Sequence, residues 1–258
     1  MEIKEVVNEK YGQAALRVHS GGSSCCGVSA AIEDCDAITS NLYDGSQTGT
    51  LPRRAVLASL GCGNPTALAQ LNAGETVLDL GSDGGIDMLL SARRVGSTGR
   101  AIGLDVTDEM LAMAREDQRK AGVIDVVLSN FVINLSADED RVLREAFRVS
   151  EPGGRFAVSN AVTRGDVPVE VRQNMLLWVG YLAGALQDWE DVAKLVKVGF
   201  DDIDIEPTRV WSIEDARTVL TGQGVDVDAM ASAVDGKFIS AFIRATKPAS
   251  CCAPGCCV

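Results

Sequence analysis

The sequence lacks long apolar runs and is poor in basic side chains. No stretch reaches the roughly 18 apolar residues of a membrane-spanning helix, and residues 1–12 lack the basic and apolar regions of a signal peptide. With 24 basic against 36 acidic residues, the net charge is −12. This argues against nucleic acid or an anionic membrane as a partner, because phosphate binding needs clustered Lys and Arg. We expect a soluble, cytoplasmic protein that acts on a small molecule.

Cysteine, by contrast, is abundant. The chain has eight, and a cytosolic-looking chain uses such thiols for soft ions or redox chemistry more often than for a disulfide framework. Cys62 lies in an LGCGNP motif. The remaining seven lie near the two ends: Cys25, Cys26, Cys35, Cys251, Cys252, Cys256 and Cys257. The alternative is that the N-terminal cysteines are incidental and the tail is disordered.

A glycine-rich turn between a strand and a helix is the main functional motif. The apolar run over 77–80 is typical of a buried parallel strand, and it leads into a turn over 81–85 with three glycines. Glycines let the backbone approach a ligand closely. A helix over 86–95 follows, and a second strand over 101–104 ends at Asp105, which can accept hydrogen bonds from ribose hydroxyls. The pattern predicts a nucleotide-cofactor site.

The glycine spacing separates two cofactor classes. A dinucleotide fingerprint needs glycines at 81, 83 and 86, but the chain has Asp83 and Ile86 at the last two positions. The acid-x-Gly-x-Gly-x-Gly pattern of S-adenosylmethionine enzymes is met by Asp79, Gly81 and Gly85, and it fails only at Asp83. We therefore favour S-adenosylmethionine. A nicotinamide dinucleotide, or a glycine turn without a ligand, stays open as an alternative.

Strand and helix signals alternate along the chain, which predicts an α/β fold with a doubly wound, mostly parallel sheet and a smaller C-terminal α+β part. The expected strands lie at 77–80, 101–104, 125–128, 155–158, 201–205 and 238–245. The expected helices lie at 86–95, 108–121, 138–149, 168–182, 188–197 and 213–220. Residues 21–50 are expected to form a loop or mobile lid. We divide the chain into an N-terminal helix with a Cys-containing mobile segment (1–50), a cofactor-binding domain (51–165), a C-terminal substrate domain (166–247) and a Cys-rich tail (248–258).

Five motifs occur in one order: LGCGNP, the glycine turn, SNFVINLS at 129–136, EAFRVSEPGGRFAVSN at 145–160 and LLWVGYLAGAL at 176–186. In this combination the chain resembles the arsenite methyltransferases, from about residue 5 to 247. The resemblance implies a class I methyltransferase (Rossmann-like) fold and methyl transfer from S-adenosylmethionine to trivalent arsenic held by cysteine thiolates. In-line displacement needs alignment and exclusion of water more than acid or base groups. A chain with one histidine, His19, fits such a reaction.

The resemblance also implies candidate site residues. Cys62 corresponds to an arsenic-binding cysteine, and Cys25, Cys26 or Cys35 to an N-terminal cysteine that shuttles or reduces the metalloid. We take Cys62, Cys26 and Cys35 as candidate catalytic and arsenic-binding residues and the four tail cysteines as further arsenic candidates. A thiol reductant, thioredoxin or glutathione, is an implied partner. The candidate cofactor contacts are Asp79, Gly81, Ser82, Gly85, Asp87, Asp105, Val106, Met110, Asn130 and Val132.

The chain also departs from the family. Phe131 and Tyr181 stand where the family carries cysteines, and an aromatic ring cannot supply a thiolate. Asp83 adds a negative charge near the expected methionyl carboxylate, which should weaken cofactor binding. A strand and an acidic loop are missing after the helix at 108–121, and a direct connection conflicts with a right-handed crossover. We expect rearrangement or disorder around 118–125 and a weaker adenine pocket.

These departures leave three functions open. The first is methylation of a metalloid or a related small molecule. The second is binding of a soft ion through the cysteines without methylation. The third is methylation of an organic acceptor, with Phe131 and Tyr181 as an aromatic substrate wall.

Overall fold

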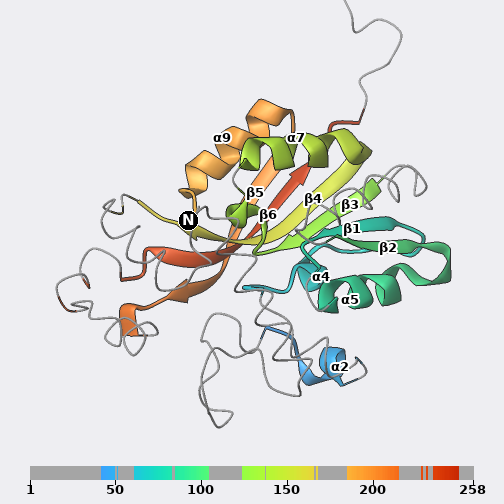
Figure 1. Ribbon diagram of the computed structural model, residues 1–258, viewed down its shortest axis with the longest axis horizontal. Coiled ribbons are helices and arrows are strands. Elements are labelled where there is room, and N and C mark those ends of the chain that lie inside the picture. The colour runs from blue at the N-terminus through green and yellow to red at the C-terminus, as the bar shows by residue number, and fades with distance from the viewer. Residues whose placement is uncertain are drawn as a thin grey trace, which may run out of the picture.

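The computed structural model describes residues 42–49, 51, 61–82, 85–104, 124–136, 138–165, 167, 185–214, 228, 231 and 235–249. In this part of the chain, helices cover both faces of one mixed sheet (Figure 1). The predicted doubly wound α/β fold is therefore confirmed. Within these ranges, none of the helices is both long and apolar enough to span a membrane.

The described sheet has six strands in the order β2-β1-β3-β4-β6-β5. They are β1 (Thr76–Leu80), β2 (Arg100–Leu104), β3 (Ile124–Asn130), β4 (Ser150–Thr163), β5 (Asp201–Trp211) and β6 (Phe238–Thr246). Neighbours from β2 to β4 are parallel, whereas β6 is antiparallel to both β4 and β5. Every strand predicted from the sequence is present, and β4 and β5 are longer than predicted.

The start of β4 differs from the prediction, because residues 151–154, which precede the predicted strand at 155–158, already lie within β4. Ile124 pairs with Ser150 and Val126 with Arg155, so the register shifts and residues 151–154 bulge out of the pairing. Gly153 has a φ of 83°, and its N–H donates to the carbonyl of Lys247. The bulge at 151–154 thus interrupts the pairing of β4 with β3 after Ser150, and regular pairing resumes at Arg155.

Within the described ranges, the sheet ends at β2 on one side. Ile124 and Asp125 already belong to β3, where the Asp125 carboxylate accepts a hydrogen bond of 2.6 Å from the N–H of Thr76. The rearrangement predicted around 118–125 therefore does not reach these two residues. Residues 105–123 lie outside the described ranges, and for them the prediction stays untested.

The helices lie on the two faces of the sheet, with α4 (Pro65–Leu68) and α5 (Ile86–Val95) on one and α7 (Glu139–Val149) and α9 (Asp188–Val198) on the other (Figure 1). Two short 3-10 helices, η2 (Gly96–Thr98) and η3 (Ile133–Leu135), follow α5 and β3. The predicted helices at 86–95, 138–149 and 188–197 are confirmed. Those at 108–121 and 168–182 and most of the one at 213–220 lie outside the described residues.

The predicted loop or lid over 21–50 is wrong in its described part. Residues Gly45–Thr48 form the short helix α2. Asp44 caps it, with a carboxylate oxygen that accepts from the N–H groups of Ser46 and Gln47, while the Gln47 side chain accepts from the N–H of Asp44. This reciprocal capping box stabilises a helix too short to persist on propensity alone.

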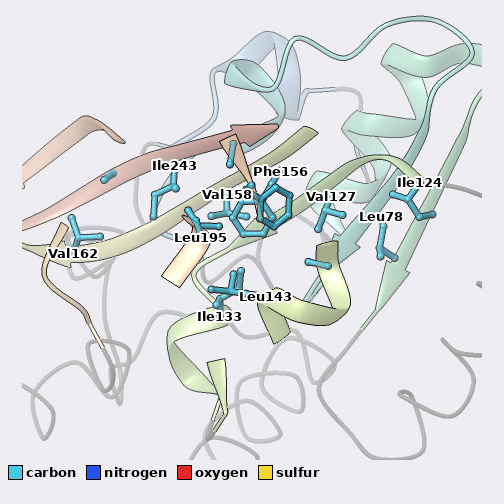
Figure 2. Close-up of a cluster of buried hydrophobic side chains, with 14 of the residues drawn as sticks. Leu78, Ile124, Val127, Ile133, Leu143, Phe156, Val158, Val162, Leu195 and Ile243 are labelled. Atoms are coloured by element: carbon cyan, nitrogen blue, oxygen red, sulfur yellow. The ribbon is translucent and has the colours of Figure 1, made fainter. Parts of the chain in front are cut away.

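The core has two parts because both faces of the sheet are covered. On the α7 and α9 face, Phe156, Val158 and Ile243 of the sheet pack with Leu143 and Leu195 of the helices (Figure 2). On the α4 and α5 face, the alternate strand residues pack with Ala69 and Val95; they are Val77, Val126, Leu128, Ala157 and Phe242. Strands buried on both faces become nearly continuous apolar runs. Polar side chains are also buried, among them Asn130 at the carboxyl end of β3 and Ser159 and Asn160 in β4.

Candidate active site

The glycine turn closes onto the end of β2. The N–H groups of Gly81 and Ser82 both donate to the carbonyl of Leu104, each at 2.7 Å. Gly81 has a φ of 75°, and a Cβ there would lie 2.2 Å from a methyl carbon of Val132. Only glycine fits this turn, because a side chain would be both strained and in collision. Val132, a predicted cofactor contact, is therefore placed against Gly81.

Helix α5 begins at the turn without a side-chain cap. Its N-cap is Gly85, with φ 82° and ψ 20°, and among the described residues no side chain caps the helix. A helix N-terminus of this kind favours an anionic group, since its amides and the helix dipole both attract negative charge. Asp79 precedes the turn and is buried in β1, beside Gly103 of β2 and Leu128 of β3.

Asn130, the last residue of β3, is the centre of a buried hydrogen-bond network. Its Nδ2 lies 2.9 Å from Asp87 Oδ2, 2.9 Å from the carbonyl of Gly63 and 3.0 Å from the hydroxyl of Tyr43. Its Oδ1 accepts from the N–H groups of Cys62 and Gly63 at 3.0 and 3.2 Å. One amide thus joins the LGCGNP loop to the first turn of α5.

Asp87 is almost completely buried at this junction. Its Oδ2 accepts a hydrogen bond of 2.9 Å from the Tyr43 hydroxyl as well as the bond from Asn130. Burial raises the pKa of Asp87 to about 6, although the bonds from Asn130 and Tyr43 and the charge of Arg94 oppose this. Oδ1 is buried and has no hydrogen-bond partner among the described residues. It is an acceptor that a donor group of a ligand would satisfy.

The LGCGNP loop is packed too tightly for any side chain beside its cysteine. A Cβ on Gly61 would lie 2.1 Å from Asn130 Nδ2, and one on Gly63 would lie 2.4 Å from the hydroxyl of Ser159. Asn64 then caps α4, and Pro65 follows at its first position. The two glycines of the motif therefore allow the loop backbone to pack directly against the side chains of Asn130 and Ser159.

Cys62 is 1% exposed in this loop. Burial raises the pKa of its thiol to about 12, although the nearby Ser240 hydroxyl opposes this. The thiol is thus protonated at neutral pH, and a soft ion that binds it must displace the proton.

Comparisons with known proteins agree with this arrangement. Two models described as methyltransferase domains match residues 78–158 and 121–200. An arsenite methyltransferase of Halobacterium salinarum is 33% identical, and the match covers 96% of this chain and 67% of that protein. One of Aquipseudomonas alcaligenes is 36% identical over 60% of this chain and 52% of that protein. The crystal structure of an arsenic(III) S-adenosylmethionine methyltransferase from Chlamydomonas reinhardtii superposes with a TM-score of 0.62 at 30% identity, over 80% of this chain and 73% of that one.

The chain belongs to the arsenite methyltransferase family. It has the class I methyltransferase fold and is an S-adenosylmethionine-dependent methyltransferase. The matched region spans about two thirds of the length of the Halobacterium salinarum protein and about half that of the Aquipseudomonas alcaligenes protein.

The residues at the glycine turn fit the family's cofactor. The turn at Gly81 admits no Cβ, the α5 N-terminus has no side-chain cap, and Asp87 Oδ1 is a buried acceptor without a described partner. The methionyl end of S-adenosylmethionine carries a carboxylate and an ammonium group, which require an anion site, an acceptor and a close approach of the backbone.

The structure brings together several of the sequence-predicted residues of this methyltransferase. Asp87, Asn130 and Cys62 share one network, and Gly81, Ser82, Gly85 and Val132 form or line the turn. The others lie outside the described residues: Cys25, Cys26, Cys35, Asp83, Asp105, Val106, Met110, Tyr181, Cys251, Cys252, Cys256 and Cys257. The described residues contain no group of three His, Cys, Asp or Glu side chains placed to hold a metal ion.

Phe131, at a position where the family carries a cysteine, is completely buried. Its φ is 67°, a left-handed conformation that is strained for an aromatic residue, and its N–H donates to the carbonyl of Ser159 at 2.8 Å. The ring thus fills space next to Asn130, with backbone strain as the cost.

Tyr43 is a site residue that the sequence analysis missed. It lies 44 residues before Asp87, in a segment assigned to loop, and no local pattern marks it. Only the fold brings its hydroxyl to Asp87 and Asn130.

Proposed function

We propose that this chain transfers a methyl group from S-adenosylmethionine to trivalent arsenic held by cysteine thiolates. The observation that carries the proposal is the Asn130 amide, which bonds to the N–H of Cys62 on one side and to Asp87 on the other. It holds the thiol loop beside the turn that fits the cofactor. Membership of the arsenite methyltransferase family supports the same reaction.

Each part of the site has a separate task. When bound, S-adenosylmethionine supplies an electrophilic sulfonium methyl group. The first turn of α5 would hold its carboxylate, Asp87 its ammonium group and Asp105 its ribose hydroxyls. The protein's contribution is alignment and exclusion of water, and the near-complete burial of Cys62 and Asn130 supports that role.

Cys62 would be one of the arsenic ligands, with Cys26 and Cys35 as the other two. Trivalent arsenic is thiophilic, and three thiolates leave its lone pair free to attack the methyl carbon. Because the Cys62 thiol is protonated when free, its proton would leave together with a hydroxyl group of arsenous acid, As(OH)3, as one molecule of water. The tail cysteines Cys251, Cys252, Cys256 and Cys257 are further candidate ligands, and a small thiol or thioredoxin would be the reductant.

A second candidate is methylation of an organic acceptor. The buried Phe131 ring supports it, since a ring replaces a thiol where the family binds arsenic. An apolar wall suits an organic substrate better than a metalloid.

Calorimetric titration of the reduced protein with S-adenosylmethionine, and then with arsenite, tests the proposal when followed by mass spectrometry of the products. We expect micromolar binding of both ligands and methylated arsenic. The Cys62→Ser variant should lose arsenite affinity and keep cofactor affinity. Arsenite uptake without any methylated product would indicate a metalloid-binding protein, and cofactor binding without arsenite uptake would favour the organic acceptor.

A further inference from the structure

Tyr43 bridges two residues of the cofactor site from outside the methyltransferase core. Its hydroxyl donates to Asp87 Oδ2 at 2.9 Å and accepts from Asn130 Nδ2 at 3.0 Å. The three polar groups form a closed triangle, because Asn130 also donates to the same Asp87 oxygen. The two bonds that Oδ2 accepts restrict rotation of the carboxylate, and Oδ1 is a buried acceptor without a partner among the described residues.

The segment that carries Tyr43 has a second anchor on the LGCGNP loop. Asn64 Nδ2 donates to the carbonyl of Leu42 at 3.2 Å and to Gln47 Oε1 at 3.0 Å. The anchor at Asn64 fixes the backbone around α2, whereas the Tyr43 hydroxyl is the contact with Asp87. The two anchors can therefore be tested separately.

We propose that Tyr43 is a positioning residue for cofactor binding, whose hydroxyl orients the Asp87 carboxylate so that Oδ1 can accept the ammonium group of S-adenosylmethionine. The proposal rests on the cofactor part of the proposed function and not on arsenic as the acceptor. Without the hydroxyl, Asn130 alone would hold the carboxylate, and part of the binding energy of the cofactor would be used to orient it.

The hydroxyl also stabilises the ionised form of Asp87. In the part of the chain that the structure describes, the groups that act on the ionisation of this carboxylate are Asn130 from β3, Tyr43 and Arg94 from α5 itself, and all three favour ionisation. Loss of one of these hydrogen bonds shifts ionisation to higher pH. A purely structural role for Tyr43 would not move the pH dependence of cofactor binding.

The test uses the full chain and S-adenosylhomocysteine, which binds without turnover, titrated calorimetrically from pH 5 to 8. Tyr43→Phe should weaken binding about tenfold at pH 7.5, as expected for one hydrogen bond to a charged group, and move the pH midpoint of binding upward. Gln47→Ala is the matched control, because it removes the Gln47 bonds to Asn64 and to the N–H of Asp44 but keeps the Tyr43 hydroxyl. It should bind like the unmodified protein, with an unchanged pH midpoint.

A double-mutant cycle with Asp87→Asn shows whether Tyr43 acts through Asp87. We expect the Tyr43→Phe effect to disappear in the Asp87→Asn background. Equal losses in Tyr43→Phe and Gln47→Ala, or full additivity with Asp87→Asn, would overturn the proposal, and so would unchanged binding by Tyr43→Phe. If the chain binds S-adenosylhomocysteine but never methylates arsenite, the proposed function is wrong. The binding measurements on the Tyr43→Phe variant still test the role of Tyr43 in that case.

Discussion

The backbone N–H of Cys62 donates a hydrogen bond of 3.0 Å to Asn130 Oδ1, across 68 residues of sequence. This bond attaches the cysteine loop to the carboxyl end of β3. Both residues are buried, so neither partner can exchange the bond for one to water. The position of the thiol is therefore tied to the amide that also holds Asp87.

Asn130→Ala should destabilise the protein by about 2–4 kcal/mol, because it leaves the N–H groups of Cys62 and Gly63 buried without their acceptor. Urea denaturation measures the change. The exposed Asn72→Ala is the control, and it should cost less than about 1 kcal/mol. Equal effects at the two positions would show that the buried network contributes little to stability.

Gly61→Ala should be at least as harmful as loss of the Asn130 side chain, since the added Cβ would lie 2.1 Å from Asn130 Nδ2. We expect a loss of about 2–4 kcal/mol and weaker arsenite binding, measured by denaturation and calorimetry. Gly45→Ala is matched to it, because a Cβ there meets nothing within 4 Å. That control should stay within about 0.5 kcal/mol of the unmodified protein.

Asp191→Asn should stabilise the protein in a pH-dependent way. Burial, followed by the charges of Glu139 and Glu190, raises the pKa of Asp191 from 3.8 to about 7. The folded state therefore binds this proton more tightly than the unfolded state, so the contribution of Asp191 is most favourable below pH 4 and is lost as the pH rises to 7. The variant should gain about 1–2 kcal/mol at pH 8 and almost nothing near pH 4, once solvent screening of the mostly buried side chain is allowed for.

Urea denaturation of both proteins at several pH values measures this difference. Glu145→Gln, which removes only an exposed pair with Arg148, serves as the control and should change stability by about 0.5 kcal/mol or less. A gain from Asp191→Asn that does not vary with pH would contradict the assignment.

Restoring cysteine at two positions should recover arsenic chemistry at the expense of stability. Phe131→Cys with Tyr181→Cys should raise arsenite affinity and methylation, because two more thiols become available in the family's positions. Removal of the buried Phe131 ring should cost about 3–5 kcal/mol. Arsenite titration and thermal denaturation give the two readouts, and Phe131→Leu controls for loss of the ring without gain of a thiol. If neither affinity nor methylation increases, the activity is limited by Asp83 or by the missing segment and not by the lack of these two thiols.

Much of the fold could be predicted because local patterns agree with it. The strands at 77–80 and 238–245 and the helix at 86–95 were predicted within a residue of their bounds, since apolar runs and glycine boundaries act locally. The length of β4 was not predictable, because the bulge at 151–154 is stabilised by its partners Ile124 and Lys247 from distant parts of the chain. The helix at 45–48 was missed because its capping box lies in a segment rich in Gly and Ser.

The sequence by itself determined the family and the sheet, and it placed Asp87, Asn130 and Cys62 among the candidates. The order of the motifs and the periodicity of the apolar residues can be recognised in the sequence without knowledge of tertiary contacts. Only the tertiary structure decided how these residues act together. Tyr43 reaches Asp87, the thiol of Cys62 is held protonated, and the Phe131 ring fills its site, because burial and hydrogen bonding depend on which distant segments meet.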